Sequence, residues 1–191
     1  MILIVGHGPS LKGAKRGKEI DLHEVVRLKQ FTRFHESEDY GTKTDYICSS
    51  TEACLGMLKN KVDVKEYWLY PKLGEYDKNI HDAFKSKPHY VALNETKIWN
   101  DKFKKETGYH KGLGAYGRNI STGLAAIVIA AARLKPEKII LAGFDTLLDP
   151  TIEYESVFNP GTKHKHMHFW AIENKMLKEI SSHYNVEFIT L

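Results

Sequence analysis

Short apolar runs alternate with helical segments along this chain, which leaves few architectures open. The first run, "MILIV", is continuous, rich in branched residues and ended by glycine, as expected of a fully buried strand. Strands that alternate with helices predict an α/β Rossmann-like fold, a mostly parallel sheet flanked by helices. The expected strands are residues 1–5, 23–31, 45–50, 66–70, 89–93, 137–142 and 186–190.

The clearest helix is the apolar stretch that begins within "NISTG", residues 119–123. Ser121 or Thr122 can cap its start, and Pro136 marks its end. Its apolar run, "GLAAIVIAAARL", is too short to span a bilayer. The other expected helices are residues 51–59, 80–86, 95–107 and 168–183.

The length and the composition of the chain fit a single domain of residues 1–191, with no linker and no internal repeat. The hydrophobic content of 42% and the net charge of +4 are typical of a globular protein that tolerates anionic ligands. Cys48 and Cys54 are too few for a disulfide framework or a zinc cage. No charged leader precedes the first apolar run, so we expect a cytoplasmic protein with free thiols.

Three turns are candidates for one binding edge, because parallel sheets bind ligands beyond the carboxyl ends of their strands. They are "GHGPS" (6–10), "AGFD" (142–145) and "NISTG" (119–123). Gly6 and Gly8 allow positive φ angles and a close backbone approach, so the amides of this turn, with Ser10, could hold a phosphate. The alternative is that these glycines merely turn the chain. The hydroxyls of "NISTG" cap a helix, and a helix N-terminus also attracts anions.

The stretch "KHKHMHFWAIE" places His164, His166 and His168 just before the last helix. Alternating histidines could bind a metal, but no carboxylate or cysteine partner lies nearby, so a basic surface loop is the plainer interpretation. A histidine at a helix start could also be a general base, because its ordinary pKa lies near neutrality. Glu173 could orient the His168 ring or be a solvated helix carboxylate.

These residues resemble a known family. "GHGPSLKGAKRGKEIDLHEVVRLKQ" (6–30) resembles the large sialylmotif of the sialyltransferases, G-N-S/G-x-x-L-K-G-x-x-x-G-x-x-I-D-x-H-x-x-V-x-R-x-N. "ISTGLAAIVIAAARLKPEKIILAGFD" is similar to the small sialylmotif, and His168 with Glu173 fits the H-x-x-x-x-E of the very small motif. The short bacterial sialyltransferases have a similar G-N-G-P-S-L-K turn and G-x-D turn. Matching positions of the large motif are Gly6, Leu11, Lys12, Gly13, Gly17, Ile20, Asp21, His23, Val26 and Arg27.

The resemblance implies a GT-A-like, inverting glycosyltransferase that uses a nucleotide-activated, CMP-linked sugar and no metal. His168 would be the general base, oriented by Glu173, and a departing phosphate would be stabilised by donors and positive charge. Gly143 and Asp145 would lie near the ribose. The implied donor-binding residues are Gly6, His7, Gly8, Pro9, Ser10, Lys29, Ser121, Thr122, Gly123, Gly143, Asp145 and His166.

The chain departs from the family at His7 and Lys29, where the family has asparagines that contact the donor. The sugar is therefore open, and so is the acceptor, which is a glycan or, as in phage enzymes that modify DNA, a hydroxylated base. The basic stretch 102–112 could bind along the DNA backbone, which is a polyanion, or it could be a solvated helix face. A non-catalytic nucleotide-binding module is a third hypothesis. Residues 45–110 match no motif, and the missing anchor and paired cysteines of the secretory enzymes favour a cytoplasmic protein of a bacterial or phage-infected cell.

Overall fold

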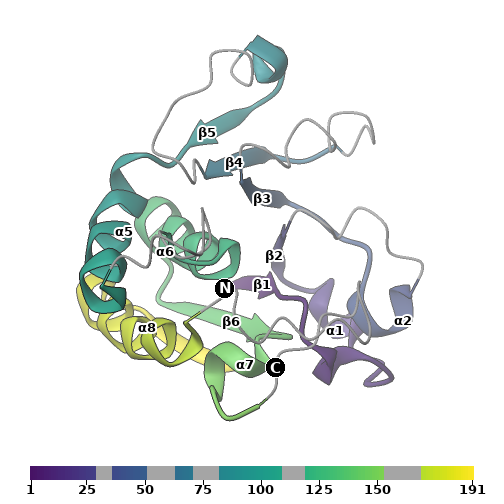
Figure 1. The fold of residues 1–191 in the computed structure, drawn as a ribbon. Coiled ribbons are helices and arrows are strands. Elements are labelled where there is room, and N and C mark those ends of the chain that lie inside the picture. Colours follow the sequence, from purple (N-terminus) through teal and green to yellow (C-terminus); the bar gives the residue numbers. More distant parts are fainter. Residues whose placement is uncertain (29–35, 51–62, 71–81, 109–118, 153–168) are drawn as a thin grey trace.

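Seven parallel strands form one sheet, in the order β5-β4-β3-β2-β1-β6-β7 (Figure 1). The computed structural model describes residues 1–28, 36–50, 63–70, 82–108, 119–152 and 169–191. Each predicted strand is present, although the predicted strand 23–31 is described only as far as Leu28. The strands are β1 (Ile2–Val5), β2 (Glu24–Leu28), β3 (Tyr46–Ser50), β4 (Glu66–Tyr70), β5 (His89–Val91), β6 (Lys138–Ala142) and β7 (Glu187–Thr190).

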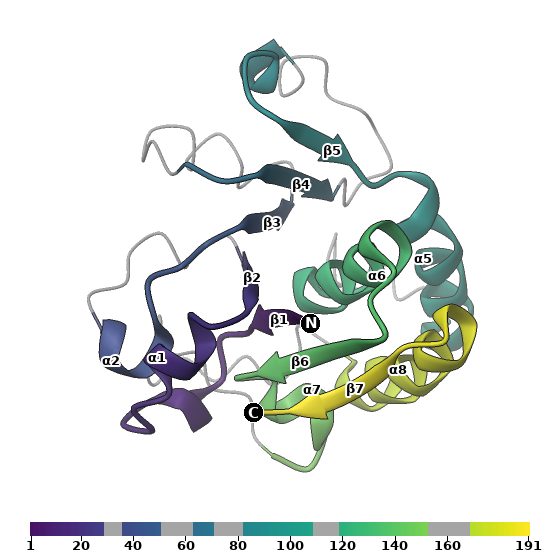
Figure 2. The same ribbon diagram turned by 180° about the vertical axis from the view of Figure 1, so that it is seen from behind.

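Helices flank this sheet, with α5, α6 and α8 on one side and α1 and α2 on the other (Figures 1 and 2). This confirms the predicted α/β, Rossmann-like class. Residues 82–84 of the predicted helix 80–86 are helical, and the predicted helix 51–59 lies outside the described residues. The helices are α1 (Gly17–Ile20), α2 (Ser37–Tyr40), α5 (Asn94–Thr107), α6 (Thr122–Leu134), α7 (Asp145–Leu148) and α8 (Trp170–Tyr184), with a 3-10 turn η1 (Pro9–Leu11).

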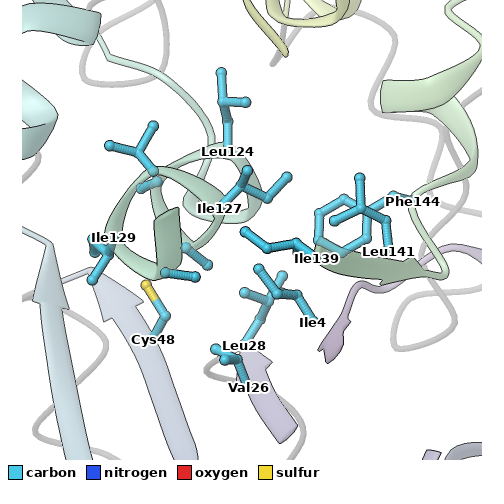
Figure 3. Close-up of a cluster of buried hydrophobic side chains, with 14 of the residues drawn as sticks. Ile4, Val26, Leu28, Cys48, Leu124, Ile127, Ile129, Ile139, Leu141 and Phe144 are labelled. Carbon is cyan, nitrogen blue, oxygen red and sulfur yellow. The ribbon is translucent and has the colours of Figure 1, made fainter. Parts of the chain in front are cut away.

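Helix α6 is the centre of the hydrophobic core. Its residues from Leu124 to Ala131 are all buried, because the sheet covers one side of the helix while α5 and α8 pack against the other. Figure 3 shows Ile127 of this helix next to Ile139 of β6, with Ile4 of β1 and Val26 of β2 farther along the same cluster. The apolar run that predicted this helix is thus explained by burial from all sides. Among the described helices, none is both long and apolar enough to cross a membrane.

The order of the strands creates a switch point next to β1. From β1 the chain builds the sheet outward through β2, β3, β4 and β5, and then returns to place β6 on the other side of β1. At such a point the connections leave in opposite directions, which opens a crevice beyond the carboxyl ends of the two central strands. These ends are Val5 of β1 and Ala142 of β6, which lie opposite each other in the register.

Candidate functional site

The turn after β1 and the turn after β6 are joined by their backbones. The N–H of Gly6 donates to the carbonyl oxygen of Ala142 at 2.7 Å, and the N–H of Gly8 donates to that of Gly143 at 2.8 Å. The pairing of β1 with β6 therefore continues past the ends of both strands. Two turns that are far apart in the sequence form one rigid unit at the switch point.

The two glycines of the first turn are required by this contact. A Cβ at Gly6 would overlap the carbonyl oxygen of Gly143, and one at Gly8 would lie 2.7 Å from Asp145 Cγ. Neither glycine uses the positive φ that its lack of a side chain allows; at this contact the positive φ, +68°, belongs to Gly143. The close approach that these glycines permit is to the second turn.

The N–H of Ser10 extends this connection, because it donates to Asp145 Oδ2 at 3.0 Å. The N–H groups of Gly6, Gly8 and Ser10 are thus already donated, and Pro9 has none. The amides of Gly6 and Gly8, for which a bound phosphate was one of two expected roles, are therefore used within the protein.

Ser121 is the N-cap of α6, one of the two residues predicted for this position. Its Oγ accepts from the N–H of Leu124 at 3.1 Å and donates to Glu173 Oε2 at 2.6 Å. Its N–H donates to Glu173 Oε1 at 2.7 Å. Glu173, in the first turn of α8, is 0% exposed, so the alternative of a solvated helix carboxylate is wrong. This carboxylate joins the starts of α6 and α8.

Thr122 and Gly123, the first two residues of α6, are more exposed to solvent than the cap Ser121. Ser121 is buried, whereas Thr122 and Gly123 are half-buried at the first positions of the helix. N–H groups at these positions lack a partner within their helix, and they form the positive end of its dipole. The Ser-Thr-Gly stretch therefore divides into a structural cap and a part that can contact an anion.

Phe144 connects the α6 start to the β1–β6 unit. A Cβ at Gly123 would lie 2.9 Å from Phe144 Cε1, and a Cβ at Gly6 would lie 2.9 Å from Phe144 Cδ2. The ring thus packs against two glycines from different turns, next to Leu141 in the core (Figure 3). Sequence reasoning did not single out this residue, although its place between Gly143 and Asp145 was a signal. All three predicted turns meet here.

Comparison with solved structures identifies the fold. The chain superposes on the sialyltransferase CstII from Campylobacter jejuni, solved with cytidine-5'-monophosphate, with a TM-score of 0.61 and 17% identity. The match covers 100% of this chain and 79% of the other. This is the sialyltransferase fold. A mammalian sialyltransferase also matches, with a TM-score of 0.58 and 16% identity over 98% of this chain and 68% of the other.

A second mammalian sialyltransferase structure, in complex with Gal-beta-1-3GalNAc-ortho-nitrophenol, matches with a TM-score of 0.51 and 15% identity. This match covers 98% of this chain and 68% of the other. No family model matches the sequence, and no curated protein does so either. The resemblance predicted from short motifs is therefore confirmed by three-dimensional structure.

Two residues that match the large motif, Arg27 and Asp21, hold parts of the fold together. The Arg27 guanidinium is buried and donates to the carbonyl oxygens of Tyr40 and Lys43, each at 2.9 Å. Burial lowers the pKa of Arg27 to about 10, although the nearby Asp21 carboxylate opposes this. Asp21 accepts from the N–H groups of Thr42 and Lys43, each at 2.9 Å. These two residues hold the segment that leads into β3.

Two lysines of the basic stretch 102–112, Lys102 and Lys104, form ion pairs in the region of α5. Lys102 pairs with Glu179 of α8, and Lys104 lies 3.7 Å from Asp101. Such pairs are typical of a solvated helix face, the plainer of the two interpretations. They do not support a surface that tracks a polyanion.

Three of the predicted site residues, Lys29, His166 and His168, lie outside the described residues. Helix α8 begins at Trp170, two residues after His168, in agreement with the predicted helix start. Within the ranges that the structure describes, no cluster of three histidine, cysteine or carboxylate side chains has the arrangement of a metal site.

Proposed function

We propose that this protein is a sialyltransferase-like glycosyltransferase, which moves a sugar from a CMP-linked donor to an acceptor hydroxyl with inversion and without metal. One observation carries the proposal: the turns 6–10, 121–123 and 143–145 meet at the carboxyl ends of β1 and β6, at the switch point of the sheet. Open α/β sheets bind nucleotides at such a point. The shared fold with a sialyltransferase solved with CMP supports the choice of nucleotide.

In this proposal the nucleotide lies across the β1–β6 unit. Gly143 and Asp145 lie near the ribose, where the Asp145 carboxylate, only half-buried, can accept from a hydroxyl. The phosphate lies at the start of α6, where the Thr122 hydroxyl and the helix dipole stabilise negative charge. His7, Lys29 and His166 supply further donors. Ser121, whose hydroxyl is already shared between Leu124 and Glu173, positions this group rather than contacting the phosphate.

The reaction needs a base, a leaving group and a donor-lined site. His168 takes the proton from the acceptor hydroxyl, whose oxygen then attacks the anomeric carbon from the face opposite the nucleotide. The bond between that carbon and the phosphate oxygen breaks, and CMP leaves with the electron pair. Charge on the departing phosphate is stabilised by the positive side chains and the α6 dipole, so the step needs no Lewis acid.

Calorimetric titration tests the donor. We expect CMP to bind in the presence of EDTA, with an affinity that magnesium leaves unchanged, and UMP, UDP and GDP to bind more weakly. A preference for a nucleoside diphosphate, or a requirement for magnesium, would contradict the proposed donor and would make His7 and Lys29 the first residues to mutate. CMP binding without any release of CMP from CMP-sialic acid, over a panel of glycan acceptors, would favour a different activated sugar or the non-catalytic module.

A further inference from the structure

The part of the chain that matches no motif meets the start of α6 at one buried point. The N–H of Ile120, which precedes the cap Ser121, donates to Asn100 Oδ1 of α5 at 3.1 Å. The hydroxyl of Tyr70, the last residue of β4, lies 2.9 Å from the same Oδ1 and 3.2 Å from the carbonyl oxygen of Ile120. Both backbone polar groups of Ile120 thus face side chains from remote elements.

This contact is shielded from water. Asn100 is 7% exposed, Ile120 1% and Tyr70 0%. A buried N–H or carbonyl that loses its partner has no water to replace it, so the loss is felt in full. The backbone N–H of Ile120 also fixes the orientation of the Asn100 amide, because only its oxygen can accept.

The start of α6 is therefore held from two sides. Glu173 of α8 fixes Ser121 through its N–H and its hydroxyl, and Asn100 of α5 fixes the preceding residue, Ile120. Tyr70 adds the end of β4 to this connection. The bonds of Asn100 and Tyr70 are to Ile120 and not to Thr122, so these two side chains act through the backbone that leads into the helix.

We propose that Asn100 and Tyr70 are positioning residues for the nucleotide site. They hold Ile120 so that the first turn of α6 meets the donor phosphate without having to be ordered on binding. A preorganised segment binds more tightly because it loses less conformational freedom. The proposal rests on the proposed function, and it gives the unmatched middle of the chain a role in the donor site.

The experiment compares variants of α5 and β4 by CMP titration and by hydrogen exchange of the segment 119–125. Asn100→Leu removes the accepting oxygen, Asn100→Asp keeps one, and Tyr70→Phe removes only the hydroxyl. Thr96→Val is the matched control on the same helix. Thr96 is also buried, at 2% exposure, but its hydroxyl donates at 2.6 Å to Ala92, which lies outside the α6 start.

We expect Asn100→Leu to raise the Kd for CMP about tenfold or more and to accelerate exchange at Ile120. Tyr70→Phe should show a smaller change in both, because Asn100 still accepts from Ile120. Asn100→Asp, which keeps an accepting oxygen, should lie closer to the unmodified protein than Asn100→Leu in both measurements. Thr96→Val should keep the protection at Ile120 and the affinity of the unmodified protein. If Asn100→Leu does not fold, Tyr70→Phe carries the test.

Two results would overturn the inference: unchanged CMP affinity in the variants that lose protection at Ile120, or an equal loss of affinity in Thr96→Val. Failure of the proposed function is separate from both, because it appears as absent CMP binding in the unmodified protein. In that case the exchange at Ile120 still decides whether Asn100 and Tyr70 hold the start of α6.

Discussion

The two edges of the sheet handle charge in different ways. At the amino edge, where the strands begin, carboxylates pair with basic side chains. Lys65 lies 2.6 Å from Glu24 and 3.1 Å from Asp45, and Lys138 lies 2.8 Å from Glu187. These pairs tie the beginnings of neighbouring strands together.

At the carboxyl edge the described carboxylates are bound by backbone instead. Asp145 accepts from the N–H of Ser10, and Glu173 accepts from the N–H and hydroxyl of Ser121. Such bonds fix a negative charge without using a lysine or an arginine. The comparison teaches that the amino edge uses its cations for the fold, whereas the carboxylates of Asp145 and Glu173 at the carboxyl edge are held without a cation.

If this difference reflects function, a change at the carboxyl edge should affect binding or turnover, and one at the amino edge should affect only stability. The largest effect is expected from His168→Ala. Loss of the proposed general base should lower the release of CMP from CMP-sialic acid by a factor of about 10²–10⁴. Affinity for CMP should be unchanged.

The matched control is His183→Ala, an exposed histidine near the end of α8, the helix that follows His168 in the sequence; this change should leave both quantities unchanged. Unchanged turnover in His168→Ala would show that the assignment of the base is wrong. Loss of both turnover and CMP affinity would instead assign His168 to the phosphate.

A large effect on binding is expected from Gly8→Ala. The new methyl group would lie against the Asp145 carboxylate and force the two turns apart. We expect the free energy of unfolding to fall by about 1–3 kcal/mol and CMP affinity to fall about tenfold or more. Thermal unfolding and calorimetry measure the two effects.

Gly13→Ala is the control for this change. Gly13 has a positive φ of +75°, and a methyl group added there would have no neighbour within 4 Å. Alanine at this position therefore strains the backbone without reaching the β1–β6 unit. It should lower stability and leave CMP affinity intact. Equal losses of affinity in the two variants would contradict the proposed site.

A smaller effect on CMP binding is expected from Thr122→Val, and it distinguishes the role of the Thr122 hydroxyl from that of Ser121. Thr122→Val should weaken CMP binding about fivefold to tenfold and change stability by less than about 0.5 kcal/mol. Ser121→Ala removes the cap and one partner of buried Glu173, and should lower the free energy of unfolding by about 2 kcal/mol. The reverse pattern would show that Ser121, and not Thr122, contacts the ligand.

The sequence predicted the fold well because its signals are local. Every expected strand has a short apolar run, and α6 has both a hydroxyl cap and a helix-ending proline. The short helices α1, α2 and α7 were not predicted, since elements of one turn depend on tertiary contacts. Gly17 illustrates this: a Cβ there would overlap the carbonyl oxygen of Ser37.

The site was predictable in outline only. The rule that ligands bind at the carboxyl ends of parallel strands brought three turns together correctly. The partners within the site come from residues far apart in the chain, such as Ser10 with Asp145 and Ser121 with Glu173. No local pattern reveals such partners, which is why the sequence left open whether Glu173 is solvated and whether the amides of Gly6 and Gly8 hold a phosphate.

The smallest effect belongs to the amino edge and depends on pH. The bond to Lys65 holds the pKa of Glu24 below its usual value, so this pair stabilises the fold above the unfolded pKa of about 4.3. The contribution is lost as the pH falls through the lowered pKa of the folded state. Lys65→Met should therefore cost less than about 1 kcal/mol at pH 7, since the pair is partly exposed. Denaturant titrations should show this difference shrinking below about pH 4.3, with CMP affinity at pH 7 unchanged. A loss of CMP affinity in Lys65→Met would mean that the two edges are coupled, and the contrast between them would fail.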